Sequence, residues 1–364
     1  MKFTVSRDNF LDGLQKVQNV VSTRTTLPIL SNVLLQAREG ALQLTTTDLD
    51  VSVRGGTTAQ VDRMGATTLP ARRLSSIIRE LPASEVQVEV DSKNITTLRS
   101  GNSLFKIHGL PEEEFPQLPN FQNPKVFSIP QIQLRDGLRK TSYAISTDET
   151  RYVLNGVLFS FRDNKLTLVA TDGRRLALVD IELEFPRTQE IDVIVPTKAV
   201  AELQRTLGED GEARVSVSEN QVSFELNGTL IVSKLIEGNY PNYRQVIPGE
   251  AKERITLERE AFLNAVHRVS LLASDKSNSV KLMFAKNNLD ITANTPQVGE
   301  ARESLAINYR GRDLAIAFNP EFLMAPLKNL AVDEVFLDLI DEMSPGVVKI
   351  NTPFLYVIMP MRIS

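Results

Sequence analysis

A threefold internal repeat constrains this 364-residue chain more than any other feature of its sequence. Three stretches align with one another: FTVSRDNFLDGLQKV from Phe3, FSIPQIQLRDGLRKT from Phe127 and ITLEREAFLNAVHRV from Ile255. The Asp-Gly-Leu motif at Asp12 recurs at Asp136, 124 residues later. Further markers keep this order and spacing: LQLTTTD ends at Asp48, LTLVATD at Asp172 and LDITAN at Asn294, and a helix-opening proline falls at Pro70, Pro196 and Pro320. Three repeats of about 120 residues therefore account for nearly the whole chain.

Each repeat has the pattern of two helices and roughly eight strands. Phe10, Leu14, Val17 and Val21 step by four, three and four residues, which is one face of an amphipathic helix. The alternating run NVLLQAREGALQLTTTDLDVSVRGG predicts strands with a hairpin at Gly40. A second helix follows a proline, as in LPARRLSSIIRELP. The expected helices span 7–21, 71–80, 131–145, 197–206, 258–272 and 320–330. The sequence predicts an α+β fold of three repeated modules, each with two helices on a curved antiparallel sheet.

Two proline-rich stretches are the expected module boundaries. They are LPEEEFPQLPNFQNP at 110–124 and YPNYRQVIPGEAKE at 240–253. We therefore expect modules over 1–121, 127–249 and 252–364.

Composition excludes several classes of protein. Apolar residues make up 42% and charged residues 24%, as in ordinary globular proteins. There is no Cys and there are only two His, which leaves little for thiolate, zinc or imidazole chemistry. No phosphate-binding GxxxxGK[ST] or zinc-binding HExxH motif occurs. The first residues lack a signal-peptide pattern, and no apolar run approaches a membrane span. We expect a cytoplasmic protein that is no enzyme, with no catalytic residues, cofactor, metal or membrane partner.

Two groups of carboxylates are candidate enzymatic sites. Glu112, Glu113 and Glu114 could bind a metal, but the flanking prolines favour a solvated linker. Asp148 and Glu149 could form an acid/base pair, but a loop after a helix is the simpler interpretation. His108 and His267 are interpreted in the same way, as ordinary surface residues.

Charge is distributed unevenly along the chain. The expected helices hold 13 Lys and Arg against 8 Asp and Glu, whereas the remainder holds 28 against 37. Basic helices on an acidic body suit a protein that holds a polyanion without adhering to others, although basic helix surfaces also occur simply for solubility.

Five motifs together resemble the bacterial sliding clamp family, the beta subunit of DNA polymerase III. They are TLPILSN from Thr26, RYVLNGVLF from Arg151, LVATDGRRLAL from Leu168, SKLIEGNYPNYRQVIP from Ser233 and the C-terminal YVIMPMRIS. The resemblance spans the whole chain, with the threefold repeat in register.

This resemblance implies a ring-forming DNA clamp fold. Two copies would join head to tail into a homodimer with helices inside, which encircles duplex DNA without reading its sequence and makes polymerases processive. Implied partners are the DNA polymerase III alpha subunit, the clamp loader delta subunit, and other polymerases and mismatch-repair proteins that carry short linear motifs. The positions that match DNA-binding residues are Arg24, Tyr152 and Lys198, with Arg72, Arg73, Arg135, Arg139 and Lys140 as further candidates on helices.

The resemblance also places a pocket for partner peptides between the second and third modules. Its residues here are Leu154, Thr171, Gly173, Arg174, Arg175, Leu176, Pro241, Val246, Val357, Met359, Pro360, Met361 and Arg362. Met and small apolar residues can accept differing peptides, while Arg175 and Arg362 can anchor polar ends. Gln245, Arg174 and Val153 depart from the family pattern at this pocket, which leaves the peptide preference open. A buried final strand is the alternative interpretation of YVIMPM.

At the seam between the two copies, the resemblance places Phe105 and Ile107 against Leu271 and Leu272, with Glu300 and Glu303 nearby. Asn102 and Leu104 stand where the family often has basic residues, and Arg302 interrupts the acidic run. Both sides have therefore lost charge, so the seam should depend mainly on apolar contact.

Two other function classes remain open from the residues alone. One is a metal-dependent hydrolase, which the shortage of His and Cys disfavours. The other is a repeat scaffold that binds peptides and never encircles DNA.

Overall fold

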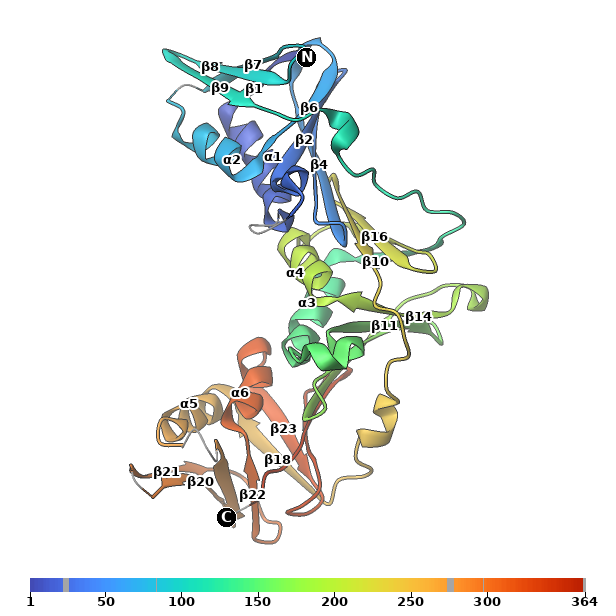
Figure 1. Cartoon of the computed structure of the whole chain (residues 1–364). Coiled ribbons are helices and arrows are strands. Elements are labelled where there is room, and N and C mark those ends of the chain that lie inside the picture. The colour runs from blue at the N-terminus through green and yellow to red at the C-terminus, as the bar shows by residue number, and fades with distance from the viewer. Residues whose placement is uncertain (22–25, 83, 274–277, 297, 363–364) are drawn as a thin grey trace. The chain divides into compact units, whose positions relative to one another are not determined.

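The computed structural model describes residues 1–21, 26–82, 84–273, 278–296 and 298–362. Over these residues the chain folds into antiparallel sheets that carry pairs of α-helices (Figure 1). The described residues of each third of the chain supply two α-helices and eight or nine strands, so the predicted α+β class is confirmed.

Six α-helices occur within these described residues. They are α1 (Arg7–Val17), α2 (Ala71–Glu80), α3 (Gln131–Thr141), α4 (Thr197–Thr206), α5 (Arg259–Ser270) and α6 (Pro320–Asn329). Two of the expected spans were too long, because α1 and α3 each continue as a tighter 3-10 turn, η1 (Gln18–Val20) and η4 (Ser142–Ala144). The expected apolar face of α1 is buried, and Ser6 caps its first turn by accepting a hydrogen bond from the Asn9 N–H.

The repeated Asp-Gly-Leu motif has a packing reason. A Cβ atom on Gly13 would lie 2.7 Å from Leu44 Cδ1, and one on Gly137 would lie 2.8 Å from Leu168 Cδ1. Both helices thus approach their sheets too closely for a side chain at this position.

By contact density the chain divides into two compact units. The first, Met1–Ile132 with Lys198–Leu235, contains a five-stranded and an eight-stranded sheet. The five-stranded sheet has the order β5 (Gln60–Arg63), β1 (Lys2–Ser6), β7 (Glu85–Val90), β8 (Ile95–Ser100), β9 (Ser103–His108). The eight-stranded sheet has the order β10 (Lys125–Pro130), β15 (Glu212–Val217), β16 (Gln221–Leu226), β17 (Thr229–Lys234), β4 (Val51–Thr58), β3 (Ala41–Thr47), β2 (Asn32–Arg38), β6 (Gly65–Pro70).

The second unit, Gln133–Thr197 with Ile236–Ser364, contains an eight-stranded and a four-stranded sheet. The eight-stranded sheet has the order β14 (Ile191–Pro196), β11 (Gly156–Arg162), β12 (Lys165–Thr171), β13 (Arg175–Glu182), β25 (Phe354–Ile358), β24 (Gly346–Lys349), β23 (Glu334–Leu339), β18 (Glu253–Glu258). The four-stranded sheet has the order β21 (Gly299–Ala306), β20 (Asn288–Thr295), β19 (Val280–Ala285), β22 (Leu314–Phe318).

Each eight-stranded sheet joins two consecutive repeats through a single ladder. In the first unit β4 pairs with β17, and Ser52 lies opposite Val232. In the second unit β13 pairs with β25, and Leu176 lies opposite Val357. Strand edges that would otherwise be open are thus closed by the next repeat.

The compact units therefore divide the chain differently from the expected modules. The stretches 110–124 and 240–253 do connect strands of successive repeats, β9 to β10 and β17 to β18. The units, however, separate after Ile132, Thr197 and Leu235, so the second repeat contributes to both.

Candidate functional site

All thirteen residues of the predicted partner pocket belong to the second compact unit. The β13–β25 ladder brings the two main segments together, with Arg175 opposite Ile358 and Leu176 opposite Val357. Beyond the strand end, the Met359 N–H donates to the Arg174 carbonyl at 3.0 Å. Residues nearly 190 positions apart in sequence thus form one surface, which we call the partner surface.

The partner surface lies on a buried apolar layer. Leu176 and Val357 belong to this layer together with Leu158, Val169 and Ile194, and Leu154 is buried as well. Within YVIMPM, Tyr356, Val357 and Ile358 are buried, as the alternative interpretation of a buried final strand predicts, whereas Met359 is exposed.

Around this layer stand the side chains that remain accessible. Met359 is 44% and Val246 50% exposed. Gly173, Arg174, Pro241 and Arg362 are also exposed, and Thr171 lies at the edge of the buried layer. Pro360 and Met361 are half-buried, and the Met361 N–H donates to the Ala317 carbonyl at 2.7 Å, which fixes the chain there.

Sequence reasoning missed four side chains at this surface. Ile236, Tyr240, Tyr243 and Ile247 are partly buried against the apolar layer, as is Val153. Burial raises the pKa of Tyr240 and of Tyr243, so both phenols stay neutral, and the Tyr240 hydroxyl donates to the Val169 carbonyl at 3.4 Å. The available signal was the row of aromatic and branched residues in SKLIEGNYPNYRQVIP, of which only Pro241 and Val246 were assigned.

A tight turn shapes the middle of the partner surface. The Asp172 carboxylate accepts hydrogen bonds from the backbone N–H groups of Arg174 at 2.9 Å and Arg175 at 3.1 Å. Gly173 between them has a φ of +85°, which favours glycine. A Cβ atom there would also lie 2.8 Å from the guanidinium of Arg151.

Arg175 is held within the protein rather than free to anchor a peptide. Its Nε donates to Asp172 at 3.0 Å, and its guanidinium lies 4.4 Å from the centre of the Phe322 ring. Its side chain is largely buried. Arg175 therefore stabilises the turn at Asp172. Among the arginines of the predicted pocket, Arg174 and Arg362 are exposed.

The junction between the first and second repeats reproduces this turn with different side chains. Asp48 accepts from the N–H groups of Asp50 and Val51, and Leu49 takes the place of Gly173 with a φ of +78°.

At this first junction, polar side chains take the places of two residues of the partner surface. Ser52 stands at the position of Leu176, and Lys234 at that of Met359, where it pairs with Asp50 at 3.0 Å. One backbone geometry thus occurs twice, with Ser52 and Lys234 at the first junction in the positions that Leu176 and Met359 hold at the second.

The predicted DNA-binding residues have differing environments. Arg24 lies outside the described residues. Tyr152, in the turn η5 (Glu149–Leu154), is 59% exposed, and Arg72 and Arg73 are exposed on α2. The Lys198 ammonium pairs with Asp48 and therefore already has an anionic partner.

Two of the three candidates on α3 share a neighbouring carboxylate. Arg139 and Lys140 each lie 2.5 Å from Asp136. Burial alone would raise the pKa of Asp136, but the hydrogen bonds from Lys140 and Arg139 outweigh it and keep the carboxyl ionised. Arg135 is exposed.

The predicted seam residues lie on or near sheet edges. Phe105 and Leu104 are exposed on β9, the last strand of the five-stranded sheet, whereas Ile107 is buried in the chain's own core. Leu271 is 71% exposed just after α5, and Leu272 is half-buried. Because Ile107 is buried within the chain, it offers little surface of its own.

Two charged residues of β21 form ion pairs with other residues of the same chain. Glu303 accepts from Arg268, which holds the pKa of this carboxyl below its usual value, and Arg302 lies 2.7 Å from Asp290. Glu300 is exposed.

In both groups of candidate enzymatic carboxylates, one member forms a hydrogen bond within the chain. Glu112 accepts a hydrogen bond from the Gln36 amide at 2.7 Å, and Asp148 caps η5 by accepting from the Thr150 N–H. In the described part of the chain, no group of three or more His, Asp or Glu could hold a metal ion. No helix among these residues is both long and apolar enough to cross a membrane.

Family models and known proteins match this chain over nearly its whole length. Three family models match in succession: the N-terminal, central and C-terminal domains of the DNA polymerase III beta subunit, over residues 1–119, 128–242 and 244–362. The beta sliding clamp of Chlamydia muridarum is 38% identical over 363 residues, covering 100% of this chain and 99% of its own. That of Escherichia coli is 36% identical over 368 residues, with full coverage of both chains.

Solved structures agree with the family models. The sliding clamp of Bartonella birtlesii, crystallised with griselimycin, superposes with a TM-score of 0.95 at 38% identity, over 100% of both chains. The DNA polymerase sliding clamp of Bacillus subtilis superposes with a TM-score of 0.95 at 31% identity, again over 100% of both. The predicted resemblance is confirmed, and the chain belongs to the bacterial DNA polymerase III beta subunit family, the DNA sliding clamps.

Proposed function

We propose that two copies of this chain close head to tail into a ring that encircles duplex DNA and tethers replication and repair proteins to it. The observation that carries the ring is the pair of edge strands, β9 and β21, at which the outer sheets of the first and third repeats end. Exposed edges are a liability that a second copy would cover.

Two unlike edges favour a head-to-tail arrangement. β9 presents Phe105 and Leu104, whereas the neighbourhood of β21 presents Leu271. Contact between unlike surfaces forms a closed ring when the rotation between copies closes, and three repeats from each copy would then make six.

In this proposal the ring holds DNA by enclosing it rather than by tight contact with it. Members of the family are non-catalytic processivity factors, so the chain is not an enzyme. Lys198, Tyr152 and the arginines of α2 and α3 would guide the duplex through contact with phosphate and sugar, which carries no sequence information.

The partner surface is the proposed tether. Its apolar layer and exposed Met359 suit short motifs of varied sequence, including those of the DNA polymerase III alpha subunit, the clamp loader delta subunit, other polymerases and mismatch-repair proteins. A polymerase held there would remain at high effective concentration beside its template.

Retention on circular DNA tests the ring. The protein is loaded by an ATP-driven clamp loader onto nicked circles, half of the sample is cut with a restriction enzyme, and bound protein is measured by gel filtration in moderate salt. We expect retention on circles, loss from linear DNA, and retention again when the linear ends are blocked by a bound protein. Equal loss from circles and open linear DNA would contradict encirclement and favour the peptide-binding scaffold.

A further inference from the structure

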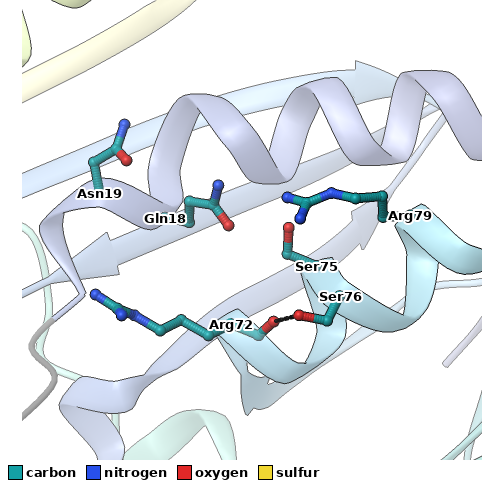
Figure 2. A pocket seen from close by; sticks show the side chains of 6 residues that line it. All are labelled: Gln18, Asn19, Arg72, Ser75, Ser76 and Arg79. Carbon is teal, nitrogen blue, oxygen red and sulfur yellow. Dashed lines mark hydrogen bonds between the residues drawn. The ribbon is translucent and has the colours of Figure 1, made fainter.

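Two cavities in the first repeat are each lined by two arginines. The cavity between η1 and α2 holds Arg72 and Arg79 (Figure 2), and these helix arginines belong to the surface proposed above to guide the duplex. The second cavity, of about 450 Å³, lies between the strands β2 to β4 and the segment 112–120. We call it the outer cavity, and Arg38 and Arg54 are its two arginines.

Strand alternation places the outer cavity on the face of the sheet that lies away from α1. Leu42 and Leu44 of β3 are fully buried, and a Cβ atom on Gly13 of α1 would lie 2.7 Å from Leu44 Cδ1. Successive side chains of a strand point to opposite faces, so Thr45 lies on the other face. Arg54 of β4 pairs with Thr45 in the ladder, and both residues line the outer cavity.

The segment 112–120 forms the other wall and is anchored at its start. The Thr68 N–H donates to the Leu110 carbonyl at 3.0 Å, and the Leu110 N–H donates to the Thr68 carbonyl at 3.1 Å. Phe115 is buried in one apolar cluster with Leu34 of β2. Phe115 and Leu34 both line the outer cavity, which therefore has an apolar side.

Thr45 has an unsatisfied hydroxyl at this cavity. It is only 2% exposed, and its hydroxyl has no hydrogen-bond partner among the described residues. The next two threonines of β3 are satisfied, because Thr46 donates to the Val17 carbonyl and Thr47 to the Val51 carbonyl. A buried hydroxyl without a partner is destabilising, so an acceptor oxygen in the outer cavity would relieve it.

Arg54 also lacks a partner. Its Nε is buried without a hydrogen bond, and within the described part of the chain neither Arg54 nor Arg38 forms an ion pair, whereas Arg162 of β11 pairs with Asp192 at 2.8 Å. Burial and, after it, the nearby charge of Arg38 lower the pKa of Arg54. An anion between the two guanidinium groups would offset both effects.

Two carboxylates line the outer cavity but leave its arginines unpaired. Glu112 accepts a hydrogen bond from the Gln36 amide at 2.7 Å, and Glu113 is exposed. In the described structure neither carboxylate forms an ion pair with Arg38 or Arg54. The positive charge on the sheet side of the cavity is therefore available to a ligand.

The fold does not require this polar pair. In the second repeat Val169 and Leu178 stand opposite each other, 124 residues after Thr45 and Arg54 and in the same register. Val169 belongs to the buried apolar layer beneath the partner surface, and Leu178 packs against that layer. The same pair of sheet positions is thus filled by apolar side chains in one repeat and by hydrogen-bond donors in the other, which favours a binding role over a packing role.

We propose that the outer cavity binds a small organic carboxylate. The carboxylate would accept hydrogen bonds from the Thr45 hydroxyl and the Arg54 guanidinium, with Arg38 beside them, and its apolar body would contact Phe115 and Leu34. The volume lies within the range of small-molecule sites, about 300 to 1,000 Å³. This inference goes beyond the proposed function and does not depend on it, because the cavity lies on the sheet face away from α1.

Phenylacetate is the probe, titrated by calorimetry into the full-length protein at constant ionic strength, and phenylacetamide is its neutral match. We expect saturable binding of the acid alone. Thr45→Val keeps the shape of the side chain and should weaken binding roughly tenfold, since one hydrogen bond to a charged group is lost. Arg54→Leu should abolish saturable binding, and Arg54→Lys should have an intermediate effect because it keeps the charge and loses the planar fork.

The variants carry their own test of folding. Thr45→Val and Arg54→Leu introduce the residue types that the second repeat has at these positions, so the sheet should form as before. Without ligand their melting temperatures should equal or exceed that of the unaltered protein, because an unsatisfied buried group is removed. Arg214→Gln, which removes a charge at an exposed position of β15 outside the cavity, should bind phenylacetate as the unaltered protein does.

Three outcomes would overturn the proposal. Equal binding of phenylacetate and phenylacetamide, or no saturable binding of either, would exclude a carboxylate site. Affinity unchanged in both Thr45→Val and Arg54→Leu would place the ligand elsewhere. Binding of the acidic peptide acetyl-Ala-Phe-Glu-Ala-amide without binding of phenylacetate would replace the small molecule by a protein segment. Retention on circular DNA should be the same in Arg54→Leu as in the unaltered protein, so a failure of the ring leaves this test unaffected.

Discussion

At the scale of single residues, aspartates rather than arginines organise the partner surface. Asp172 fixes the turn through two backbone hydrogen bonds and also holds Arg175. The repeat in the sequence predicted that Asp48 and Asp172 are equivalent, and both make the same backbone contacts. The position of Arg175 against Phe322 could not be predicted, because that contact joins residues far apart in the chain.

Replacing Met361 and Arg362 by Ala should weaken binding of partner peptides by about 1 to 3 kcal/mol, because an apolar contact and an exposed charge are lost. Calorimetric titration with a motif peptide measures the change, with molecular size followed in parallel. Lys234→Ala, at the equivalent junction of the first two repeats, should leave affinity unaltered. An unchanged affinity in the double variant would mean that the partner surface is assigned wrongly.

Asp338 should make stability depend on acidity. This buried carboxylate on β23 accepts hydrogen bonds from Arg254 at 2.7 Å and lies 2.9 Å from Lys349. Burial would raise its pKa, but the bonds from Arg254 and Lys349 outweigh burial and lower it. Because the folded pKa lies below the unfolded value of about 3.9, the stabilisation is complete above that pH and is lost as pH falls through the folded pKa.

Asp338→Asn should therefore lower the free energy of unfolding at neutral pH by about 1 to 3 kcal/mol and flatten its dependence on pH below about 4. Urea unfolding at several pH values measures both effects. The exposed Asp333→Asn is the control. A variant as acid-sensitive as the original protein would exclude Asp338 as the source.

At the scale of elements, apolar periodicity predicted where helices begin and which face they bury. It placed the C-terminal ends of α1 and α3 too far along the chain. Val20 and Val21 are buried and continue the pattern beyond α1, yet the backbone there is a 3-10 turn and then leaves the helix. Periodicity reports burial, and burial does not distinguish the last turn of an α-helix from a tighter one.

The seam should depend on apolar contact between elements. At ~1 M salt, where the Debye length is ~3 Å, the dimer should scarcely weaken, since Glu303 and Arg302 already have partners within the chain. Leu272→Ala, two residues after α5, should loosen the dimer by roughly 2 to 4 kcal/mol through lost burial. Analytical ultracentrifugation over a salt series decides between this expectation and a seam held by ion pairs, which would dissociate readily in high salt.

At the scale of the whole molecule, the helices carry 13 basic and 7 acidic residues on a chain of net charge -4. Several of these basic residues are paired within the chain, including Lys198 with Asp48 and Arg268 with Glu303. Composition predicted the surplus of positive charge on the helices, but could not predict how much of it is neutralised locally.

Unaided binding to duplex DNA should consequently be weak and fall with salt. Asp48→Asn should strengthen it and steepen its salt dependence by about one unit of slope, because Lys198 is released while the turn keeps its backbone hydrogen bonds. Fluorescence anisotropy over a salt series measures the slope. Asp62→Asn, an equal change of charge at an exposed position, should have little effect, and equal effects of both variants would exclude a specific role of Lys198.

The β4–β17 ladder determines what a single proteolytic cut between the first two repeats does to the protein. A protease that cuts once within 110–124 would sever the covalent link after the first repeat, yet the two pieces would remain hydrogen-bonded from Val51 to Arg54. The nicked protein should elute intact from a sizing column and separate only in denaturant. A single repeat expressed alone would instead expose an unpaired strand edge and aggregate. We therefore expect that no repeat of this chain is stable by itself.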